Sequence, residues 1–210
     1  MLFRRLAIVL LAVSILPGIR AQVSAETESS MALLQHAVDA AKANHLEDAV
    51  FYFYAGQLRR RLEVALFPPN SDEDAEGVYA FQYTIGQSLN LAASDDPAAS
   101  LRALDRYDRW KPTVAPGFKP LWPSAHPVKP AAVLPQIEAT KRDFSVHMRL
   151  LMTLLEDPEY FKQFHIARDC NMAPVAQRPA GASCKAAHDS MFRIEKQRGV
   201  EGMESLSRKE

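Results

Sequence analysis

Apolar and polar residues alternate with helical periodicity over most of the chain. Residues 31–43, with Ser30 as the expected N-cap, place apolar side chains three and four positions apart, the spacing of one helix face. Residues 46–66 continue this pattern until the Phe-Pro-Pro sequence at 67–69 ends it. The four aromatic residues at 51–54 would cover most of a helix circumference. The pattern predicts two helices joined by a short turn, the second with neighbours on more than one side.

The same spacing predicts further helices, one of them from an ambiguous pattern. Residues 78–93 fit a helix, although Gly86 and the alternating aromatic residues over 79–83 also suit a strand. Asp-Pro pairs at 96–97 and 157–158 each place a capping carboxylate before a proline at the first helical position. The remaining predicted helices cover residues 97–109, 135–156, 158–164 and 186–198.

Residues 111–130 interrupt the helices with six prolines, which neither a helix nor a central strand accepts. Large apolar side chains lie among these prolines, which favours a strap that packs on the helices. A mobile hinge between two subdomains is the alternative. The large side chains are Trp110, Phe118, Leu121 and Trp122.

The N-terminus has the pattern of a secretory signal peptide. Arg4 and Arg5 precede an apolar run over residues 6–16, and the Val-Ser-Ala sequence at 23–25 offers small residues for cleavage. The run is shorter than the roughly 20 residues of a membrane-spanning helix. We therefore predict that residues 1–25 are a removed signal, with cleavage after Ala21 as the alternative.

The mature chain is then expected to be one helical domain over residues 26–199, followed by a polar, flexible tail over 200–210. No segment after the signal is long and apolar enough to anchor the chain in a membrane. We expect an exported protein, periplasmic or secreted, without a stable membrane anchor.

Two cysteines, Cys170 and Cys184, are 14 positions apart in a stretch rich in proline. In an oxidising compartment this spacing favours one disulfide. The alternative is a metal site in which His165 and His188 join the two thiolates as four ligands for zinc.

Composition and charge exclude several classes of protein. With 48% hydrophobic and 24% charged residues, the chain can bury a core, unlike a disordered tail. Equal numbers of basic and acidic residues, 25 each, argue against a nucleic-acid partner, because phosphate binding needs excess cations.

Residues 33–66 resemble a tetratricopeptide or Sel1-like helical hairpin. The resemblance rests on small residues in the first helix, a turn at 44–45, the sequence Leu-Glu-Asp-Ala-Val at 46–50 and the aromatic pair 53–54. It implies paired helices without the repeats of a solenoid. Motifs at 48–59, 110–122 and 157–161 also resemble those of a group of exported bacterial helical proteins without an assigned activity. That resemblance implies one domain and carries over no catalytic residue.

An acidic segment partly follows the pattern of a calcium-binding loop. Asp72, Asp74 and Glu76 occupy its first, third and fifth places. Gly77 occupies the sixth place, but Tyr83 stands where the twelfth requires a bidentate glutamate. We therefore expect a solvated acidic loop that caps the next helix.

Three consecutive arginines, Arg59, Arg60 and Arg61, would spread over about 200° of a helix and so would not converge on one anion. We expect a solvated face with local pairing to Glu63.

Catalytic motifs are missing from the sequence. It contains no G-x-S-x-G, H-E-x-x-H or C-x-x-C motif and no glycine-rich phosphate loop. No cofactor is expected, and we predict that the protein is not an enzyme.

The sequence therefore predicts an all-α protein of about six helices in one domain, with a strap and a disulfide. The leading functional hypothesis is a non-enzymatic module that binds another protein of the cell envelope, in its most specific form an immunity-type inhibitor of an envelope-targeted toxin. Alternatives are a metal-binding protein or enzyme with a site near His165 and His188, and a structural envelope component. The predicted interface residues are Tyr52, Tyr54, Arg60, Asp72, Asp74 and Glu76.

Overall fold

The computed structural model describes residues 25–124, 126–172 and 177–200. Within them the all-α prediction is confirmed: they form seven α-helices and one short 3₁₀ helix. The predicted signal and tail lie outside these residues except for Ala25 and Val200. In chain order the elements are α2 (Ser30–Lys42), α3 (Leu46–Leu66), η1 (Asp72–Ala75), α4 (Glu76–Asp95), α5 (Pro97–Arg109), α6 (Pro130–Leu155), α7 (Pro158–Met172) and α8 (Gly181–Gln197).

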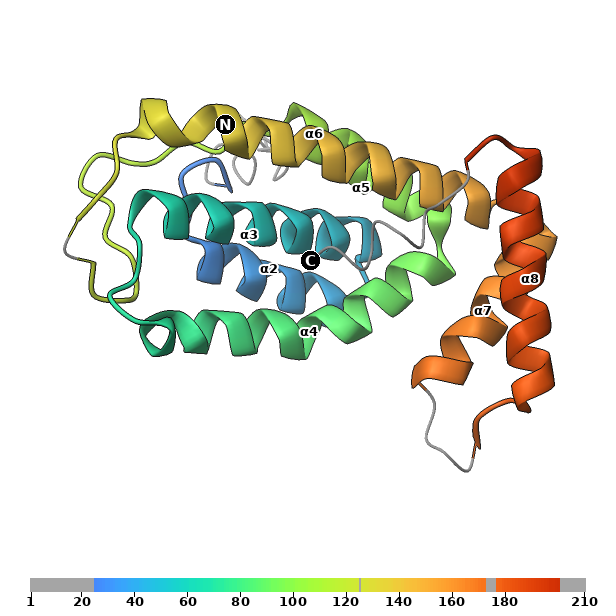
Figure 1. Cartoon of the computed structure of the whole chain (residues 1–210). Coiled ribbons are helices and arrows are strands. Elements are labelled where there is room, and N and C mark those ends of the chain that lie inside the picture. Colours follow the sequence, from blue (N-terminus) through green and yellow to red (C-terminus); the bar gives the residue numbers. More distant parts are fainter. Residues whose placement is uncertain (1–24, 125, 173–176, 201–210) are drawn as a thin grey trace, which may run out of the picture.

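Helix α3 is the centre of the fold and packs against α2, α4, α5 and α6 (Figure 1). Its aromatic run explains this position, because Phe51, Phe53 and Tyr54 are all buried while Tyr52 is half-buried. Side chains on most of its circumference therefore contact neighbouring helices, as the sequence predicts.

Helices α2 and α3 form an antiparallel hairpin that depends on close backbone approach. A Cβ atom at Gly56 would lie 2.8 Å from Leu34 Cδ2, so only glycine fits between the two helices without a shift. The N-cap of α2 is Ser29, whose hydroxyl accepts a hydrogen bond from the Ala32 backbone, and not Ser30 as expected.

Ser30 instead joins a buried polar network with α3. Its backbone N–H donates to Glu63 Oε1 at 2.8 Å and its hydroxyl to Glu63 Oε2 at 2.5 Å. Arg59 Nε donates to the same carboxylate at 3.0 Å, and Arg59 Nη1 donates to the Thr113 carbonyl at 2.6 Å. Because Arg59 has no exposed surface, the expectation of a solvated arginine face is wrong at this position, although its pairing with Glu63 is confirmed.

Helix α4 runs without a break through the segment whose alternation also suited a strand. Gly86 faces α3, where an added Cβ would lie 3.1 Å from Phe53 Cζ. The glycine that weakens the helix prediction is therefore explained by close packing between α3 and α4.

The proline-rich strap packs on the bundle through its two tryptophans. Trp110 is 1% exposed and its indole N–H donates to the Ala25 carbonyl at 3.1 Å. Trp122 is 4% exposed and its indole N–H donates to the Phe67 carbonyl at 2.7 Å. Leu121 differs from the expectation because it points to solvent, with 67% of its surface exposed.

Helix α6 begins at Pro130, five residues earlier than the predicted start at Pro135, and the strap ends within one residue of its predicted end. Pro130 suits the first position of a helix, where a backbone N–H has no intrahelical partner. Pro135 lies inside the helix and has no N–H to donate to the Ala131 carbonyl, so its cost is one backbone hydrogen bond.

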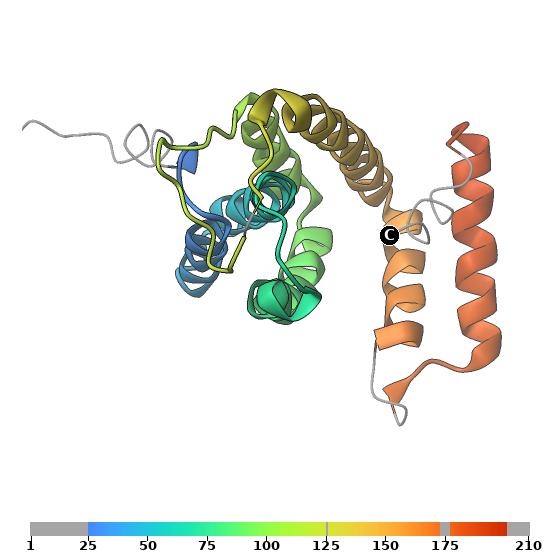
Figure 2. The same cartoon turned by 60° about the vertical axis from the view of Figure 1, so that its left-hand side comes forward.

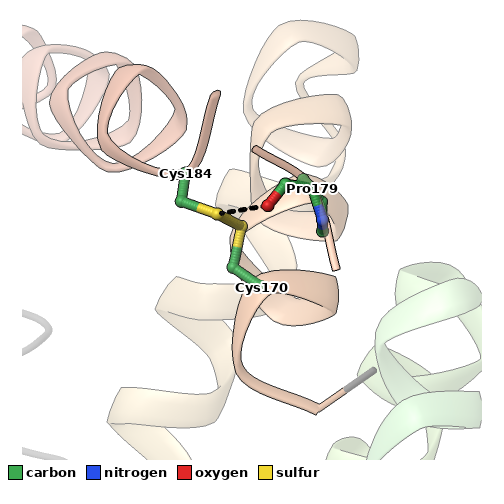
Figure 3. The surroundings of a disulfide bond; sticks show 3 residues. All are labelled: Cys170, Pro179 and Cys184. Carbon is green, nitrogen blue, oxygen red and sulfur yellow. Dashed lines mark hydrogen bonds between the residues drawn. A yellow bond between two sulfur atoms is a disulfide. The ribbon is translucent and has the colours of Figure 1, made fainter. Parts of the chain in front are cut away.

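Helices α7 and α8 form a second hairpin beside the bundle, reached through the end of α6 (Figure 2). Both helices are longer than predicted. The disulfide between Cys170 and Cys184 joins the end of α7 to the start of α8, with 5.9 Å between the Cα atoms (Figure 3). The Cys184 sulfur also lies 3.6 Å from the Pro179 carbonyl oxygen. Farther along the hairpin, the Tyr160 hydroxyl donates to buried Glu195 at 2.8 Å.

Among the helices that the structure describes, none is both long and apolar enough to cross a bilayer.

Candidate functional site

The candidate site is a concave region over the middle of α3, where α4 and α7 form its walls. Its main hollow has a volume of about 350 Å³ and is open to solvent. We call it the α3 cleft. It is lined by Phe53, Gln57, Gln82, Tyr83, Gly86, Gln87, Asn90, Leu91, Ser94, Phe164, Arg168 and Met172.

The α4 wall supplies a stripe of neutral polar side chains. Tyr83, Gln87 and Asn90 are spaced by four and three residues, which places them on one helix face. Tyr83 stands at the rim with 76% of its surface exposed. Each amide of this wall, like that of Gln57 on the floor, can both donate and accept hydrogen bonds.

Helix α7 closes one end of the cleft and is tied to the end of α4 by charge. Arg168 Nη1 lies 2.8 Å from Asp95 Oδ1, and His165 Nε2 lies 3.6 Å from the same oxygen. Burial lowers the pKa of His165, and the nearby Arg168 charge adds to this effect against the opposing effect of Asp95. The imidazole is therefore neutral at neutral pH. The ion pair with Asp95 is formed by Arg168.

A smaller hollow of about 40 Å³ lies on the other side of Gln57, between α3, α5 and α6. We call it the tyrosine pocket. It is lined by Tyr54, Gln57, Leu58, Arg61, Tyr107, Thr140 and Phe144. Gln57 lines both hollows, so the α3 cleft and the tyrosine pocket are neighbours along the same helix.

The two tyrosines of this pocket are held protonated by their surroundings. Burial raises the pKa of Tyr54 well above its usual value of 10, and burial likewise raises the pKa of Tyr107 against the lowering effect of Arg61. Aromatic contacts fix the Tyr54 ring, whose centroid lies 4.9 Å from that of Phe144 and 6.3 Å from that of Tyr107.

The structure separates the predicted interface residues. Tyr54 is only 2% exposed, so the expectation that it lies on a partner-binding surface is corrected: its ring belongs to the core. Tyr52 is half-buried near α2 and α5, with its ring 5.2 Å from His36 and 5.6 Å from the Arg106 guanidinium. Burial raises the pKa of Tyr52, with Arg106 opposing the shift.

Arg60 lies at the contact between α3 and α4, away from Tyr52. Its Nε donates to Gln82 Oε1 at 2.6 Å, and its guanidinium lies 4.1 Å from the centroid of the Tyr79 ring. Burial lowers the pKa of Arg60, and the contact with Tyr79 opposes the shift. Through Gln82, Arg60 adjoins the α3 cleft.

The predicted acidic residues lie at the N-terminal end of α4. Asp72 and Asp74 belong to η1, and Glu76 is the first residue of α4. Asp74 Oδ2 accepts a hydrogen bond from the Ser71 backbone at 3.0 Å. Asp72 and Glu76 are exposed, so their charges face solvent next to the cleft-forming helix.

Sequence reasoning missed the α3 cleft because its residues come from three helices. One signal in the sequence could have indicated the cleft. Uncharged polar residues recur at helical spacing in α4, in the same segment whose aromatic residues alternate. Nothing in the sequence placed Phe164 and Arg168 of α7 opposite that stripe.

A further hollow, of about 580 Å³, separates α2 from α4. Its lining is mostly apolar or small, including Val38, Ile85 and Leu89, with Lys42 at its side. The accessible surface of the α3 cleft is also mostly apolar, and the difference between the two hollows is the number of side-chain amides. The α3 cleft has four, Gln57, Gln82, Gln87 and Asn90, whereas Asn44 supplies the one amide of the hollow between α2 and α4.

The alternative zinc site is not present in this arrangement. Cys170 and Cys184 are joined in a disulfide and cannot act as thiolate ligands beside His165 and His188. In the described part of the chain, no group of three or more His, Cys, Asp and Glu side chains is arranged to hold a metal ion.

Comparison with known proteins finds no matching family model, no matching curated protein and no matching solved structure.

Proposed function

We propose that the protein is a non-enzymatic module that binds another protein of the cell envelope through the α3 cleft. The observation that carries the proposal is the cleft's lining of amides around a highly exposed tyrosine. Peptide groups need one donor and one acceptor each, and glutamine and asparagine side chains supply both. The occupant is an extended segment of the partner, whose backbone pairs with Gln57, Gln87 and Asn90.

The size and composition of the cleft suit this occupant. A hollow of about 350 Å³ is within the usual range of binding pockets. Tyrosine and arginine are frequent anchors of protein interfaces, and Tyr83 of α4 and Arg168 of α7 both line the cleft. These features replace Tyr52 and Tyr54 as the proposed contacts and retain Arg60, which adjoins the cleft through Gln82.

Charge defines the partner further. From residue 67 to residue 101 the chain contains no lysine or arginine, although α4 and its neighbours carry several carboxylates. We therefore propose that the partner places basic residues near the N-terminal end of α4, where opposite charges speed encounter. The acidic residues at that end are Asp72, Glu73, Asp74 and Glu76, whereas Asp95 and Asp96 lie at the other end of α4.

The most specific form of the proposal is an immunity-type inhibitor that neutralises a toxin delivered to the envelope. The signal peptide predicted from the sequence, the absence of a catalytic motif and a cleft suited to a protein segment support it. In this form, the partner inhibits growth when directed to the envelope, and coexpression of the protein restores growth.

The test compares capture by three forms of the oxidised protein. Wild type, Tyr83→Ala and Phe192→Ala are each used to retain proteins from envelope fractions of the source organism and its competitors. Phe192 is the matched control, because it is an aromatic residue of α8 that is 57% exposed and does not line the cleft. We expect a stoichiometric partner that Phe192→Ala retains and Tyr83→Ala binds about tenfold more weakly.

Binding measurements with the purified protein and its captured partner then distinguish the candidate functions. Affinity that falls with added salt supports the basic partner, because salt screens exposed charges. Equal binding by Tyr83→Ala and wild type would overturn the assignment to the α3 cleft. Failure to retain any stoichiometric partner would overturn the binding module, and self-association without a foreign partner would favour the structural envelope component.

A further inference from the structure

We propose that the hollow between α2 and α4 binds a free fatty acid, with the acyl chain along the two helices and the carboxylate at Lys42. We call this hollow the α2–α4 groove. It lies between residues 38–46, at the end of α2 and the start of α3, and residues 84–92 of α4. This site belongs to the isolated protein and does not depend on the partner proposed for the α3 cleft.

The interior of the groove is apolar and recessed. Leu89 is 5% exposed, and Val38, Leu46 and Ile85 are half-buried, although all four side chains line the groove. Transfer of alkyl groups from water to such a lining is favourable, and the free energy gained grows with the apolar area that is buried. The lining therefore suits the hydrocarbon chain of a ligand.

The dimensions of the groove suit a chain of medium length. Its volume of about 580 Å³ lies within the range of roughly 300–1,000 Å³ that is usual for small-molecule sites. At about 1.5 Å per residue, the α4 wall over residues 84–92 spans about 12 Å. An extended chain of about ten carbons, with C–C bonds of about 1.5 Å, has a similar length.

The charge at the groove selects a negatively charged head group. Of the described residues that line it, Lys42 is the one that carries a charge, and its ammonium has neither a hydrogen bond nor an ion pair within the described part of the chain. The neighbouring carboxylates are engaged elsewhere. Asp39 accepts a hydrogen bond from Gln35 at 3.0 Å, and Glu47 lies 2.8 Å from Arg102. The Lys42 ammonium is therefore available to a carboxylate of the ligand.

The backbone at this end of α2 also accommodates an anion. Free carbonyl groups at a helix C-terminus disfavour negative charge, but three of those in α2 already accept hydrogen bonds from the following turn. These bonds run from the N–H groups of Ala43, Asn44 and His45 to the carbonyls of Asp39, Ala41 and Ala40, at 3.1, 3.0 and 2.9 Å respectively. Asn44 has a φ of 59°, in the left-handed region that asparagine adopts more readily than most residues. Its side-chain amide lines the groove and offers a second donor to the head group.

The surface around the groove favours a small ligand over a macromolecule. None of the large apolar side chains that are exposed in the described residues lines the groove. A protein interface of usual size buries roughly 1,200–2,000 Å² and is anchored by projecting side chains, and a helix on a membrane surface inserts its apolar face. A recessed apolar lining with one cation at its end instead suits an amphiphile that enters the groove.

The probe for the head group is sodium decanoate, below its micelle-forming concentration, titrated into the oxidised protein by calorimetry at neutral pH. We expect one saturable site per chain, and weaker binding of decan-1-ol, which has the same chain without the charge. Lys42→Gln should weaken decanoate binding about threefold, as expected of an exposed charge pair, and leave decan-1-ol binding unchanged. Lys42→Arg should retain the affinity. Lys196→Gln is the matched control, because Lys196 is an exposed lysine in the last turn of α8.

The position of the acyl chain is tested by filling the groove. Ala41 is exposed and lines the groove, so the ring of Ala41→Phe can enter it without displacing the core. This variant should bind decanoate and decan-1-ol about tenfold more weakly or worse, whereas Ala186→Phe, at an exposed position of α8, should bind like wild type. In wild type, decanoate should also shift the methyl resonances of Ile85, which gives a readout that needs no variant.

Several results would overturn the proposal. Absence of saturable binding, or equal decanoate affinity of Ala41→Phe and wild type, would remove the site. Equal affinities of wild type for decanoate and decan-1-ol would remove the role of the carboxylate. Either result would leave the proposed function standing, because Tyr83→Ala tests that function separately.

Other occupants of the groove are tested with the same variant. We expect the protein neither to float with vesicles of phosphatidylglycerol nor to dimerise in sedimentation. Binding to vesicles that Ala41→Phe abolishes would assign the groove to a membrane surface. Dimerisation that Ala41→Phe abolishes would assign it to a second copy of the chain. Each of these two results would overturn the assignment to a free fatty acid.

Discussion

Three consecutive arginines of α3 have three different environments. Arg59 is fully buried and paired with Glu63, Arg60 lies over the Tyr79 ring, and Arg61 lines the tyrosine pocket. Their spread around the helix follows from the sequence alone. Which of them is buried does not, because the strap that covers Arg59 contributes Thr113, which is 54 residues away.

Removing the buried arginine should destabilise the fold strongly. Arg59→Met leaves the Glu63 carboxylate buried without its cation, and breaking such a pair costs about 3–5 kcal/mol of unfolding free energy. Arg59→Met with Glu63→Gln should recover part of the loss, since the amide can still accept from Ser30 without carrying charge. Urea unfolding measures the free energy of unfolding of the single and the double variant. The control is Arg109→Met, at an exposed position of α5, and equal effects of the two single variants would contradict the prediction.

Burial of Ala25 leads to a prediction about processing. Ala25 is 1% exposed and its carbonyl accepts the Trp110 indole N–H, so its removal would expose Trp110 and unpair the indole. Of the two predicted cleavage sites, the one after Ala21 retains this contact. We expect the intact mass of the exported protein to correspond to a chain that begins at Gln22. A mass that corresponds to a start at Glu26 would contradict this.

At the scale of elements, the helices were predictable and some of their ends were not. The bounds of α3 and α5 follow from local signals, the Phe-Pro-Pro stop at 67–69 and the Asp-Pro start at 96–97. The start of α6 was predicted too late, because Pro135 was expected to lie near a helix start and is tolerated inside it. The ends of α7 and α8 depend on the pairing of the two helices, which is a tertiary contact.

Helix α7 should be less firmly attached to α4 in acid. Burial lowers the pKa of His165 from its ordinary value of 6.5, with Arg168 lowering it and Asp95 and Asp169 raising it. His165 therefore binds a proton less readily in the folded state than in the unfolded state. Its contribution to the free energy of unfolding is fully present above about pH 6.5 and is lost as the pH falls below that value. Hydrogen exchange of α7 amides, corrected for the intrinsic rate, should show more opening at about pH 5.5 than at about pH 7.5.

His165→Gln removes the titrating group at that position. The additional opening at about pH 5.5 should then be smaller than in wild type, while exchange in α2 stays the same. An unchanged pH response of α7 in this variant would show that another group controls it. Asp95, Arg168 and Asp169 are the charged groups that influence His165, and Asp95 is the next to substitute.

At the scale of the whole molecule, the site depends on topology more than on any motif. The α3 cleft combines residues of α3, α4 and α7, and more than 80 positions separate Gln82 from Phe164. Periodicity indicates which face of each helix is apolar, and it contains no information on which helices become neighbours. This is why the all-α fold was predictable, and why the first set of interface residues included the core residue Tyr54.

The disulfide adds a thermodynamic consequence to the proposed function. It closes a loop of 14 positions between α7 and α8, which stabilises such hairpins by about 3 kcal/mol. Because α7 also lines the α3 cleft, the proposed function implies that the thiol–disulfide equilibrium and partner affinity are reciprocally coupled. The factor by which reduction weakens the complex equals the factor by which the partner makes the disulfide harder to reduce.

This coupling can be measured by titrating the protein with a dithiol reductant, with and without the saturating partner. We expect the partner to shift the midpoint toward more reducing conditions, whereas the Tyr83→Ala variant shows a smaller shift. An identical midpoint in both conditions would contradict the coupling. Under the proposed function, the unbound protein is the form most exposed to reductants, and engagement of the partner would protect its own binding site chemically.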